Sequence, residues 1–258
     1  MKLIQSRDNP AFKHLVRVVA GKVRGQVVLE GVHVCQEWLR HQGQPLCAVF
    51  DASKLAQSIE LQALADALDD SACLSIDAAL WAKLSTVAGA GQGVCFQVST
   101  PVPELPAQIS ENCLWLDRIQ DPGNLGTLLR TAAAVGIRQV FISPGSASAW
   151  SSKVLRSAQG AHFALDIFEN ADLSGLVTRL EVALAVTTLD GGTPLYDTTL
   201  PAACAWLAGN EGQGVDARLQ DLATLRVFIP QTPAVESLNV GVAMAVCLYE
   251  QVRQHRHS

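Results

Sequence analysis

Short apolar runs of strand length alternate with helical segments through residues 112–252 of this chain. The run 113–117, Cys-Leu-Trp-Leu-Asp, is typical of a strand buried on both faces of a parallel sheet. The other expected strands are 138–143, 163–168, 182–187, 204–208 and 224–229, and the expected helices are 125–135, 153–160, 172–181, 215–222 and a last one that Ser237 opens as N-cap. Because parallel neighbours need a crossover, usually a helix, this alternation predicts an α/β domain with a mainly parallel, doubly wound sheet.

A weaker alternation runs through the first hundred residues. Asn9 and Pro10 are typical of a helix start, since asparagine caps well and proline suits the first turn. The expected strands are 26–30, 46–50, 73–76 and 94–98, and the expected helices after the first are 32–41 and 59–68. The glycine-rich stretch 89–93 precedes a strand instead of following one, which predicts a flexible loop and not a dinucleotide-binding fingerprint.

A proline-rich stretch separates the two alternating regions. Residues 99–111 hold Pro101, Pro103 and Pro106 and show almost no periodicity, as linkers do. The sequence therefore predicts a small α/β domain at 1–98, a linker at 99–111 and a second domain at 112–258.

Composition narrows the protein class. Of the 258 residues 49% are hydrophobic and only 17% charged, so a sizeable core is expected and disorder is not. No apolar run approaches the roughly 20 residues that span a bilayer, and the first residues turn polar too soon for a secretory signal. The seven scattered cysteines include no Cys-x-x-Cys pair, which favours reduced thiols over a zinc site or disulfides. These features predict a cytoplasmic protein.

Charge is unevenly distributed. The formal net charge is −5, yet the first 24 residues carry six basic side chains against one acidic one, a net +5. Such a local basic face can bind nucleic-acid phosphates even in an acidic chain, because salt screens each charge over roughly 8 Å. A solvated helix face explains the pattern equally well. The candidate RNA-binding residues in this segment are Arg7, Lys13, Arg17 and Arg24.

Three polar loops, 117–130, 209–214 and 229–239, each follow an expected strand directly, and the first two contain glycine. The carboxyl ends of parallel strands lie at one edge of the sheet, so these loops are expected to converge on one site. Their candidate functional side chains are Asn124, Arg130, Asn210, Glu211, Ser237 and Asn239. Taken singly, each has an ordinary structural explanation as a turn residue, a surface arginine, a first-turn acid or a cap.

Several common active-site motifs are absent from the sequence. It contains no Walker A, no His-Glu-x-x-His and no Gly-x-Ser-x-Gly elbow, and none of its six histidines lies in these loops. Hydrolytic triads and histidine-based metal sites are therefore poor candidates, and no metal is expected.

The three loops, taken in order, resemble a known family. Residues 121–130, Asp-Pro-Gly-Asn-Leu-Gly-Thr-Leu-Leu-Arg, resemble motif 1 of the SpoU/TrmH family of RNA 2′-O-ribose methyltransferases, within the SPOUT superfamily. Residues 209–214 are similar to its motif 2, and 229–240 to its motif 3, with Gln231 where the family often has methionine. The segment 153–161 also matches, and the N-terminal part matches the family's substrate-binding domain more loosely.

This resemblance implies a trefoil-knotted C-terminal domain that binds S-adenosylmethionine, and a homodimer that completes each active site. The implied catalytic residues are Arg130, Asn124, Glu211, Ser237 and Asn239. The implied cofactor-binding residues are Gly209, Ile229, Leu238, Thr187, Leu207 and Gly214. RNA is the implied partner, either ribosomal or transfer RNA, with Arg156 as a further RNA contact.

The family assigns Arg130 the activation of the ribose hydroxyl, but a guanidinium keeps its proton in proteins. We therefore expect Arg130 to hold the RNA phosphate and stabilise the developing alkoxide rather than act as a base. One alternative is an inactive RNA-binding protein that keeps the knot, and another is a base-methylating relative. A nucleotide-linked oxidoreductase is disfavoured, because no expected strand is followed by the dinucleotide-binding motif Gly-x-Gly-x-x-Gly.

Overall fold

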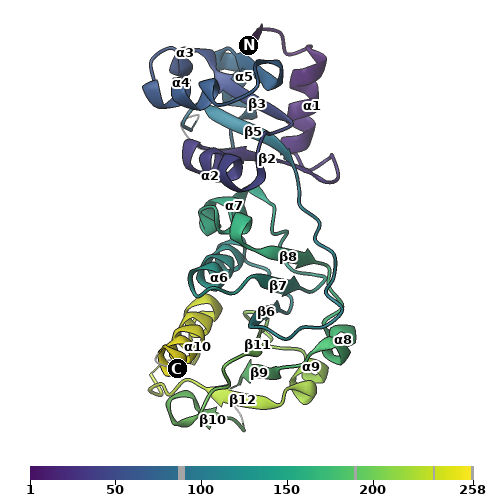
Figure 1. The fold of residues 1–258 in the computed structure, drawn as a ribbon, viewed down its shortest axis with the longest axis vertical. Helices are drawn as coiled ribbons and strands as arrows, with labels where there is room; N and C mark the ends of the chain where they lie inside the picture. The colour runs from purple at the N-terminus through teal and green to yellow at the C-terminus, as the bar shows by residue number, and fades with distance from the viewer. Residues whose placement is uncertain (87–90, 189–190, 235, 257–258) are drawn as a thin grey trace. The chain divides into compact units, whose positions relative to one another are not determined.

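The computed structural model describes residues 1–86, 91–188, 191–234 and 236–256 (Figure 1). The chain divides into two compact units. The N-terminal unit comprises Met1–Pro101 and Trp150–Leu155, and the C-terminal unit comprises Val102–Ala149 and the chain from Arg156 on. Gly89 and Ala90 of the predicted flexible loop lie outside the described residues.

The N-terminal unit contains a five-stranded sheet in the order β1-β4-β3-β5-β2. Its strands are β1 (Lys2–Ile4), β2 (Gln26–Glu30), β3 (Cys47–Asp51), β4 (Cys73–Ile76) and β5 (Val94–Ser99). Its helices are α1 (Pro10–Val19), α2 (Val32–Gln42), α3 (Ala52–Leu55), α4 (Ile59–Asp66) and α5 (Ala78–Leu84). β1, β3 and β4 are parallel, while β5 runs antiparallel to both β2 and β3.

Local signals explain the start of the first helix. The Asn9 side chain accepts a hydrogen bond from the backbone N–H of Ala11 at 2.9 Å, which confirms the predicted cap. Phe12 and Leu15 of α1 are buried with Trp81 of α5 in one core cluster. The sequence did not reveal β1 or α5, because three and seven residues are too short for a periodic pattern to stand out.

The C-terminal unit contains a seven-stranded sheet in the order β10-β12-β9-β11-β6-β7-β8. Its strands are β6 (Cys113–Leu116), β7 (Gln139–Ile142), β8 (Asp166–Glu169), β9 (Ala183–Thr187), β10 (Thr193–Pro194), β11 (Cys204–Ala208) and β12 (Leu225–Phe228). All its described strand pairings are parallel, which confirms the predicted parallel α/β fold.

Helices cover both faces of this sheet. They are α6 (Pro122–Ala134), α8 (Leu173–Leu176), α9 (Ala217–Leu222) and α10 (Val240–His255), while α7 (Ser152–Ala158) begins in the N-terminal unit and ends in this one. Figure 1 shows α6 and α10 on one side of the sheet and α8 and α9 on the other. In the core, Phe141 of β7 stacks on Phe168 of β8 with ring centroids 4.6 Å apart and meets Trp115 of β6 edge-on at 6.0 Å.

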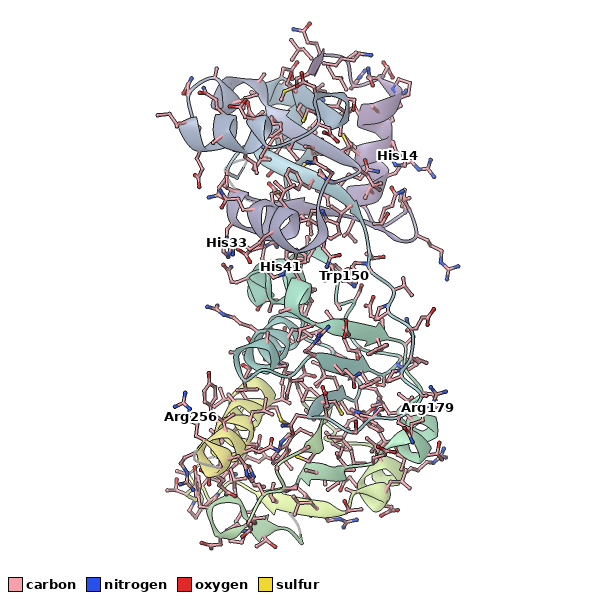
Figure 2. The ribbon with its side chains drawn as sticks, viewed as in Figure 1. His14, His33, His41, Trp150, Arg179 and Arg256 are labelled. Carbon is pink, nitrogen blue, oxygen red and sulfur yellow. The ribbon has the colours of Figure 1, made fainter. Side chains whose placement is uncertain are left out.

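Two predicted elements differ from the structure near β8 and α8. Residues Ala161–Ala164 form a 3₁₀ turn, and β8 starts at Asp166, because this turn buries His162 and Phe163 instead of extending them. The helix predicted at 172–181 is only α8 followed by a 3₁₀ turn. Arg179 of that turn donates from Nη1 to the carbonyl of Pro106 at 2.8 Å (Figure 2).

The start of the last helix was also predicted wrongly. α10 begins at Val240, and its cap is Asn239, whose side-chain oxygen accepts from the N–H groups of Gly241 at 2.9 Å and Val242 at 3.3 Å. Ser237, the predicted cap, is an equally good residue type for this role, but it lies two residues before the observed cap. Across the described residues, none of the helices has both the length and the apolar character that crossing a membrane requires.

Candidate functional site

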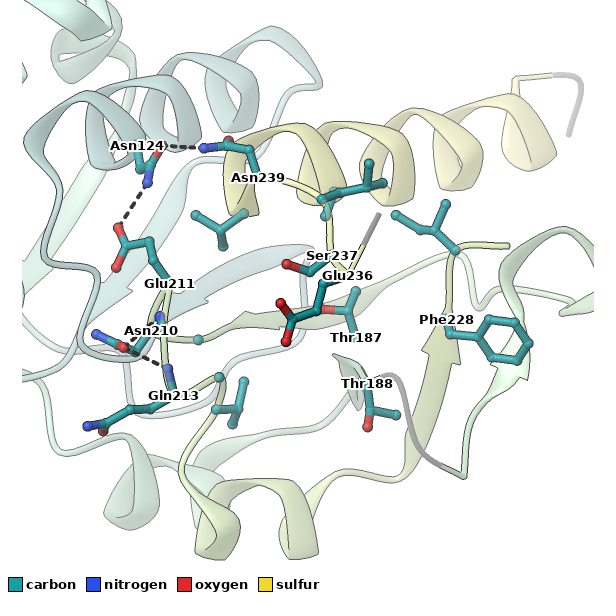
Figure 3. A pocket seen from close by; sticks show the side chains of 18 of the residues that line it. Asn124, Thr187, Thr188, Asn210, Glu211, Gln213, Phe228, Glu236, Ser237 and Asn239 are labelled. Atoms are coloured by element: carbon teal, nitrogen blue, oxygen red, sulfur yellow. Dashed lines mark hydrogen bonds between the residues drawn. The ribbon is translucent and has the colours of Figure 1, made fainter. Parts of the chain in front are cut away.

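A pocket of about 550 Å³ opens where strands β9, β11 and β12 end (Figure 3). We call it the strand-end pocket. Residues from all three predicted loops line it, so their predicted convergence is confirmed, and Thr187 and Thr188 after β9 add a fourth segment. Its lining residues are Asn124, Thr187, Thr188, 209–215, Gln220, Phe228, Ile229, Gln231, 236–240 and Ala243.

A chain of hydrogen bonds joins the three motif loops beside this pocket. Asn239 donates from Nδ2 to Oδ1 of Asn124 at 2.8 Å, and Asn124 donates from Nδ2 to Oε1 of Glu211 at 3.0 Å (Figure 3). The Glu211 carboxylate also accepts from the backbone N–H groups of Gln120 at 3.2 Å and Asp121 at 3.1 Å. Glu211 therefore fixes which way the Asn124 amide faces, and Asn124 fixes Asn239.

The position of Glu211 affects its acidity. Burial alone raises the pKa of its carboxyl group, but hydrogen bonds from Asn124 and the backbone N–H groups of Asp121 and Gln120 outweigh that effect. The net result is a pKa below the ordinary value, because each of these donors favours the charged form. These N–H groups also lie at the start of α6, where the helix dipole favours an anion.

Glycines of the motifs permit close packing of the chain on itself. A Cβ at Gly209 would collide with the backbone of Gly214 and Val215, so the loop after β11 can fold back only with glycine there. A Cβ at Gly126 would likewise collide with the Ser157 side chain. Gly209 is one of the implied cofactor-binding residues, and the groups nearest to a Cβ at this position are backbone atoms of its own loop.

A buried carboxylate that the sequence did not single out holds the same loop from the other side. Asp117, only 4% exposed, pairs with Arg118 at 3.1 Å and accepts from the backbone N–H of Asp216 at 2.9 Å. Asn210 donates from Nδ2 to the carbonyl of Arg118 at 2.8 Å. The sequence does contain a signal for Asp117. It ends the expected strand 113–117, and a charged residue at the end of a buried apolar run is unusual.

Comparison with known proteins bears on this arrangement. Residues 111–249 match the model described as "SpoU rRNA Methylase family". The chain is 31% identical over 256 residues to the 23S rRNA (guanosine(2553)-2′-O)-methyltransferase RlmP of Bacillus subtilis (strain 168), covering 96% of this chain and 98% of that protein. The chain belongs to the SpoU methylase family. The resemblance inferred from the three motifs is thereby confirmed.

Solved structures of this SpoU fold cover nearly the whole chain. One described as an RNA 2′-O ribose methyltransferase has a TM-score of 0.80 at 26% identity and covers 98% of this chain and 99% of its own. The SpoU methyltransferase AviRb from Streptomyces viridochromogenes, in complex with the cofactor AdoMet, has a TM-score of 0.85 at 23% identity, covering 97% and 99%. Both likenesses extend over the N-terminal unit as well as the SpoU methylase region.

The strand-end pocket gathers most of the residues predicted from the SpoU motifs. Four of the five predicted catalytic residues line it, namely Asn124, Glu211, Ser237 and Asn239. Of the predicted cofactor-binding residues, Gly209, Ile229, Leu238, Thr187 and Gly214 line it as well. Leu207 does not, because it is fully buried in the core as part of β11.

Arg130, the remaining predicted catalytic residue, lies on the exposed face of α6 and not among the residues that line the pocket. The predicted RNA-binding residues Arg7, Lys13, Arg17, Arg24 and Arg156 are all exposed. Lys13 pairs with Asp8 at 2.8 Å, an exposed ion pair that leaves the side chain at the surface.

The chemistry of the pocket lining narrows the class of ligand. Among the described residues that line it, none is lysine, arginine or histidine, and two, Glu211 and Glu236, are acidic. Apolar side chains come from Val215, Phe228, Ile229, Leu238 and Val240. No group of histidine, cysteine, aspartate and glutamate suited to a metal ion occurs within the described part of the chain. The lining suits a ligand with an apolar part and a positive charge.

Proposed function

We propose that this chain transfers the methyl group of S-adenosylmethionine to a ribose 2′-hydroxyl of structured RNA, with ribosomal RNA the favoured class. The observation that carries the proposal is the hydrogen-bond chain Asn239–Asn124–Glu211, which joins residues of all three motifs at one pocket. RlmP of Bacillus subtilis, similar to this chain along almost its full length, is a 2′-O-methyltransferase of 23S rRNA.

The pocket residues fit S-adenosylmethionine. Ile229 and Leu238 offer apolar contacts to an adenine, and the loop 209–214 offers backbone donors and acceptors. The lining of acidic residues without cations suits a sulfonium and is unfavourable to the pyrophosphate of a dinucleotide. When bound, this cofactor supplies an electrophilic methyl group, and AviRb, with the same fold, has been solved with it.

The protein's own contribution to the reaction is positioning and charge stabilisation. Ser237 and Asn239 lie at the pocket and would hold the ribose hydroxyl in line with the methyl group, an arrangement that can contribute several kcal/mol. The Arg130 guanidinium stays protonated, so it would bind the RNA phosphate and stabilise the alkoxide as it develops. The proton would leave through that phosphate or through water.

A homodimer completes this site in our proposal. The lining residues that the structure describes supply no cation for an RNA phosphate, and Arg130 lies outside the lining on α6, so a second copy would bring its own Arg130 to the pocket. On α10, Val242 is 51% exposed and Tyr249 53% exposed, seven residues apart on one face of the helix. These exposed apolar side chains support an interface through the C-terminal domain, which the proposal takes to be trefoil-knotted.

The N-terminal region provides RNA binding in this scheme. The domain 1–98 would contact RNA through the exposed basic residues of and around α1, with the linker 99–111 leading to the methyltransferase domain 112–258. The proposed enzyme would act in the cytoplasm, which the 23S rRNA substrate named for the bacterial relative RlmP supports. An inactive RNA-binding protein is not supported, because the catalytic residue types of all three motifs are present and the named relatives are methyltransferases.

Radiolabelled methyl transfer tests the proposal. The purified protein, S-adenosylmethionine and ribosomal RNA from cells lacking this gene should give ribose-methylated RNA. Arg130→Ala should lower turnover by about 10²–10³-fold, the range for losing one oxyanion donor, with cofactor affinity unchanged. Arg138→Ala is the matched control, since Arg138 is an exposed arginine paired with Asp166 at 3.4 Å. Near-normal turnover of Arg130→Ala would remove this residue from the mechanism.

A further inference from the structure

The two acidic residues of the strand-end pocket differ in how their carboxylates are used. Glu211 accepts hydrogen bonds from Gln120, Asp121 and Asn124, and its charge faces the N-terminus of α6. Its charge is therefore largely offset inside the protein. Glu211 therefore holds the pocket's loops in place and contributes little to the electrostatic field inside the pocket.

The carboxylate of Glu236 has no hydrogen-bond or ion-pair partner among the described residues. The hydrogen bond recorded for this residue is at its backbone, where its carbonyl accepts from Nε2 of Gln231 at 3.3 Å. Figure 3 shows its carboxylate turned toward the pocket, among the side chains that line it. With no basic side chain among the described lining residues, Glu236 presents a negative charge that a bound ligand is left to compensate.

The proposed cofactor and its product differ in charge, and the carboxylate of Glu236 would interact differently with the two. S-adenosylmethionine carries a positive sulfonium, whereas S-adenosylhomocysteine has a neutral thioether and lacks the methyl group. Both share the adenosine, the α-ammonium and the α-carboxylate. A carboxylate near the sulfur therefore attracts the cofactor more than the product, while one near the ammonium attracts both equally.

We propose that Glu236 determines the pocket's preference for the sulfonium over the thioether. The inference rests on the proposed function, because it takes S-adenosylmethionine as the cofactor. Loss of the positive charge on methyl transfer removes the attraction to Glu236, which helps the product to leave. Since Glu236 is exposed, the attraction is partly screened, and its effect is modest.

Calorimetry with the full chain and three ligands tests this role. The ligands are S-adenosylmethionine, S-adenosylhomocysteine and an analogue with an amine-bearing carbon in place of the sulfonium. Glu236→Gln should weaken binding of the two charged ligands by about three- to fivefold and leave S-adenosylhomocysteine unchanged. Glu111→Gln, another exposed acid of the C-terminal unit that lies outside the pocket lining, should change none of the three affinities.

Salt provides a second readout. Raising the salt concentration should reduce the wild-type preference for the charged ligands and have no effect on the preference of Glu236→Gln, because screening acts on the attraction that the variant lacks. Glu236→Asp should keep part of the preference. Equal weakening of all three ligands by Glu236→Gln would place the carboxylate at the shared ammonium and overturn the inference, as would no change at all. Failure of the wild-type chain to bind any of them would instead overturn the proposed cofactor.

Discussion

Asn124 connects two loops through the two ends of one amide group. Its Nδ2 donates to Glu211 and its Oδ1 accepts from Asn239, so both the donor and the acceptor are needed. An amide group carries a donor and an acceptor at fixed positions, so it can do both at once. The residue is thus more than a turn former, although a turn explains an Asn-x-Gly sequence equally well when the sequence is considered alone.

Asn124→Asp tests this double role. The new carboxylate would lose the donor and would face Glu211 across about 3 Å, so the two negative charges would repel each other and raise the pKa of Glu211. We expect turnover to fall by about 10²-fold through misplacement of Asn239. Methyl-transfer kinetics measure the effect, with Thr131→Ala on the same helix as a control. Wild-type turnover in the variant would show that the hydrogen-bond chain is not needed.

At the scale of elements, the sequence predicted most of the strands, though not β1 or β10, and it predicted which loops meet. Parallel pairing brings the ends of β9, β11 and β12 to one edge, so the convergence of the loops 209–214 and 229–239 follows from strand order alone. The start of α10 did not follow, because Ser237 and Asn239 cap equally well as residue types. Asn239 has the additional hydrogen bond to Asn124, a contact 115 positions away that local sequence does not contain.

The 3₁₀ turn before β8 makes stability depend on pH. His162 is buried, with Nε2 at 2.6 Å from the carbonyl of Ala149, and burial lowers its pKa to about 4. The unfolded chain, with a pKa near 6.5, binds the proton more readily, so stability is fully present above about pH 6.5 and falls as the pH drops toward 4. The loss at pH 5 is about 2 kcal/mol.

Chemical denaturation at pH 7 and pH 5 measures this loss. His162→Asn should be less stable than the wild type at pH 7, because it changes a buried and hydrogen-bonded side chain. Its stability should nevertheless change less between the two pH values, since the titrating group is gone. The same pH dependence in both proteins would show that other groups cause it.

At the scale of the whole molecule, the described residues that line the strand-end pocket of one chain include no cation for the proposed reaction. The strand-end pocket gathers donors, acceptors and acids, while Arg130 lies on the exposed face of α6. The sequence motifs predicted Arg130 and Ser237 as members of one site, but the order of motifs along a chain does not say which copy supplies each residue. A two-fold dimer would place each copy's arginine at the other copy's pocket.

A mixed dimer tests whether one copy supplies Arg130 to the pocket of the other copy. Arg130→Ala and Asn239→Ala should each inactivate the homodimer, since every site then lacks one group. A heterodimer of the two variants, purified through two different tags, pairs an intact Asn239 with an intact Arg130 at one of its two sites. We expect it to recover about half of the wild-type turnover per dimer, because one complete site is restored. An inactive heterodimer that still binds S-adenosylmethionine would show that Arg130 serves the pocket of its own chain, and a monomeric protein would rule out the shared site.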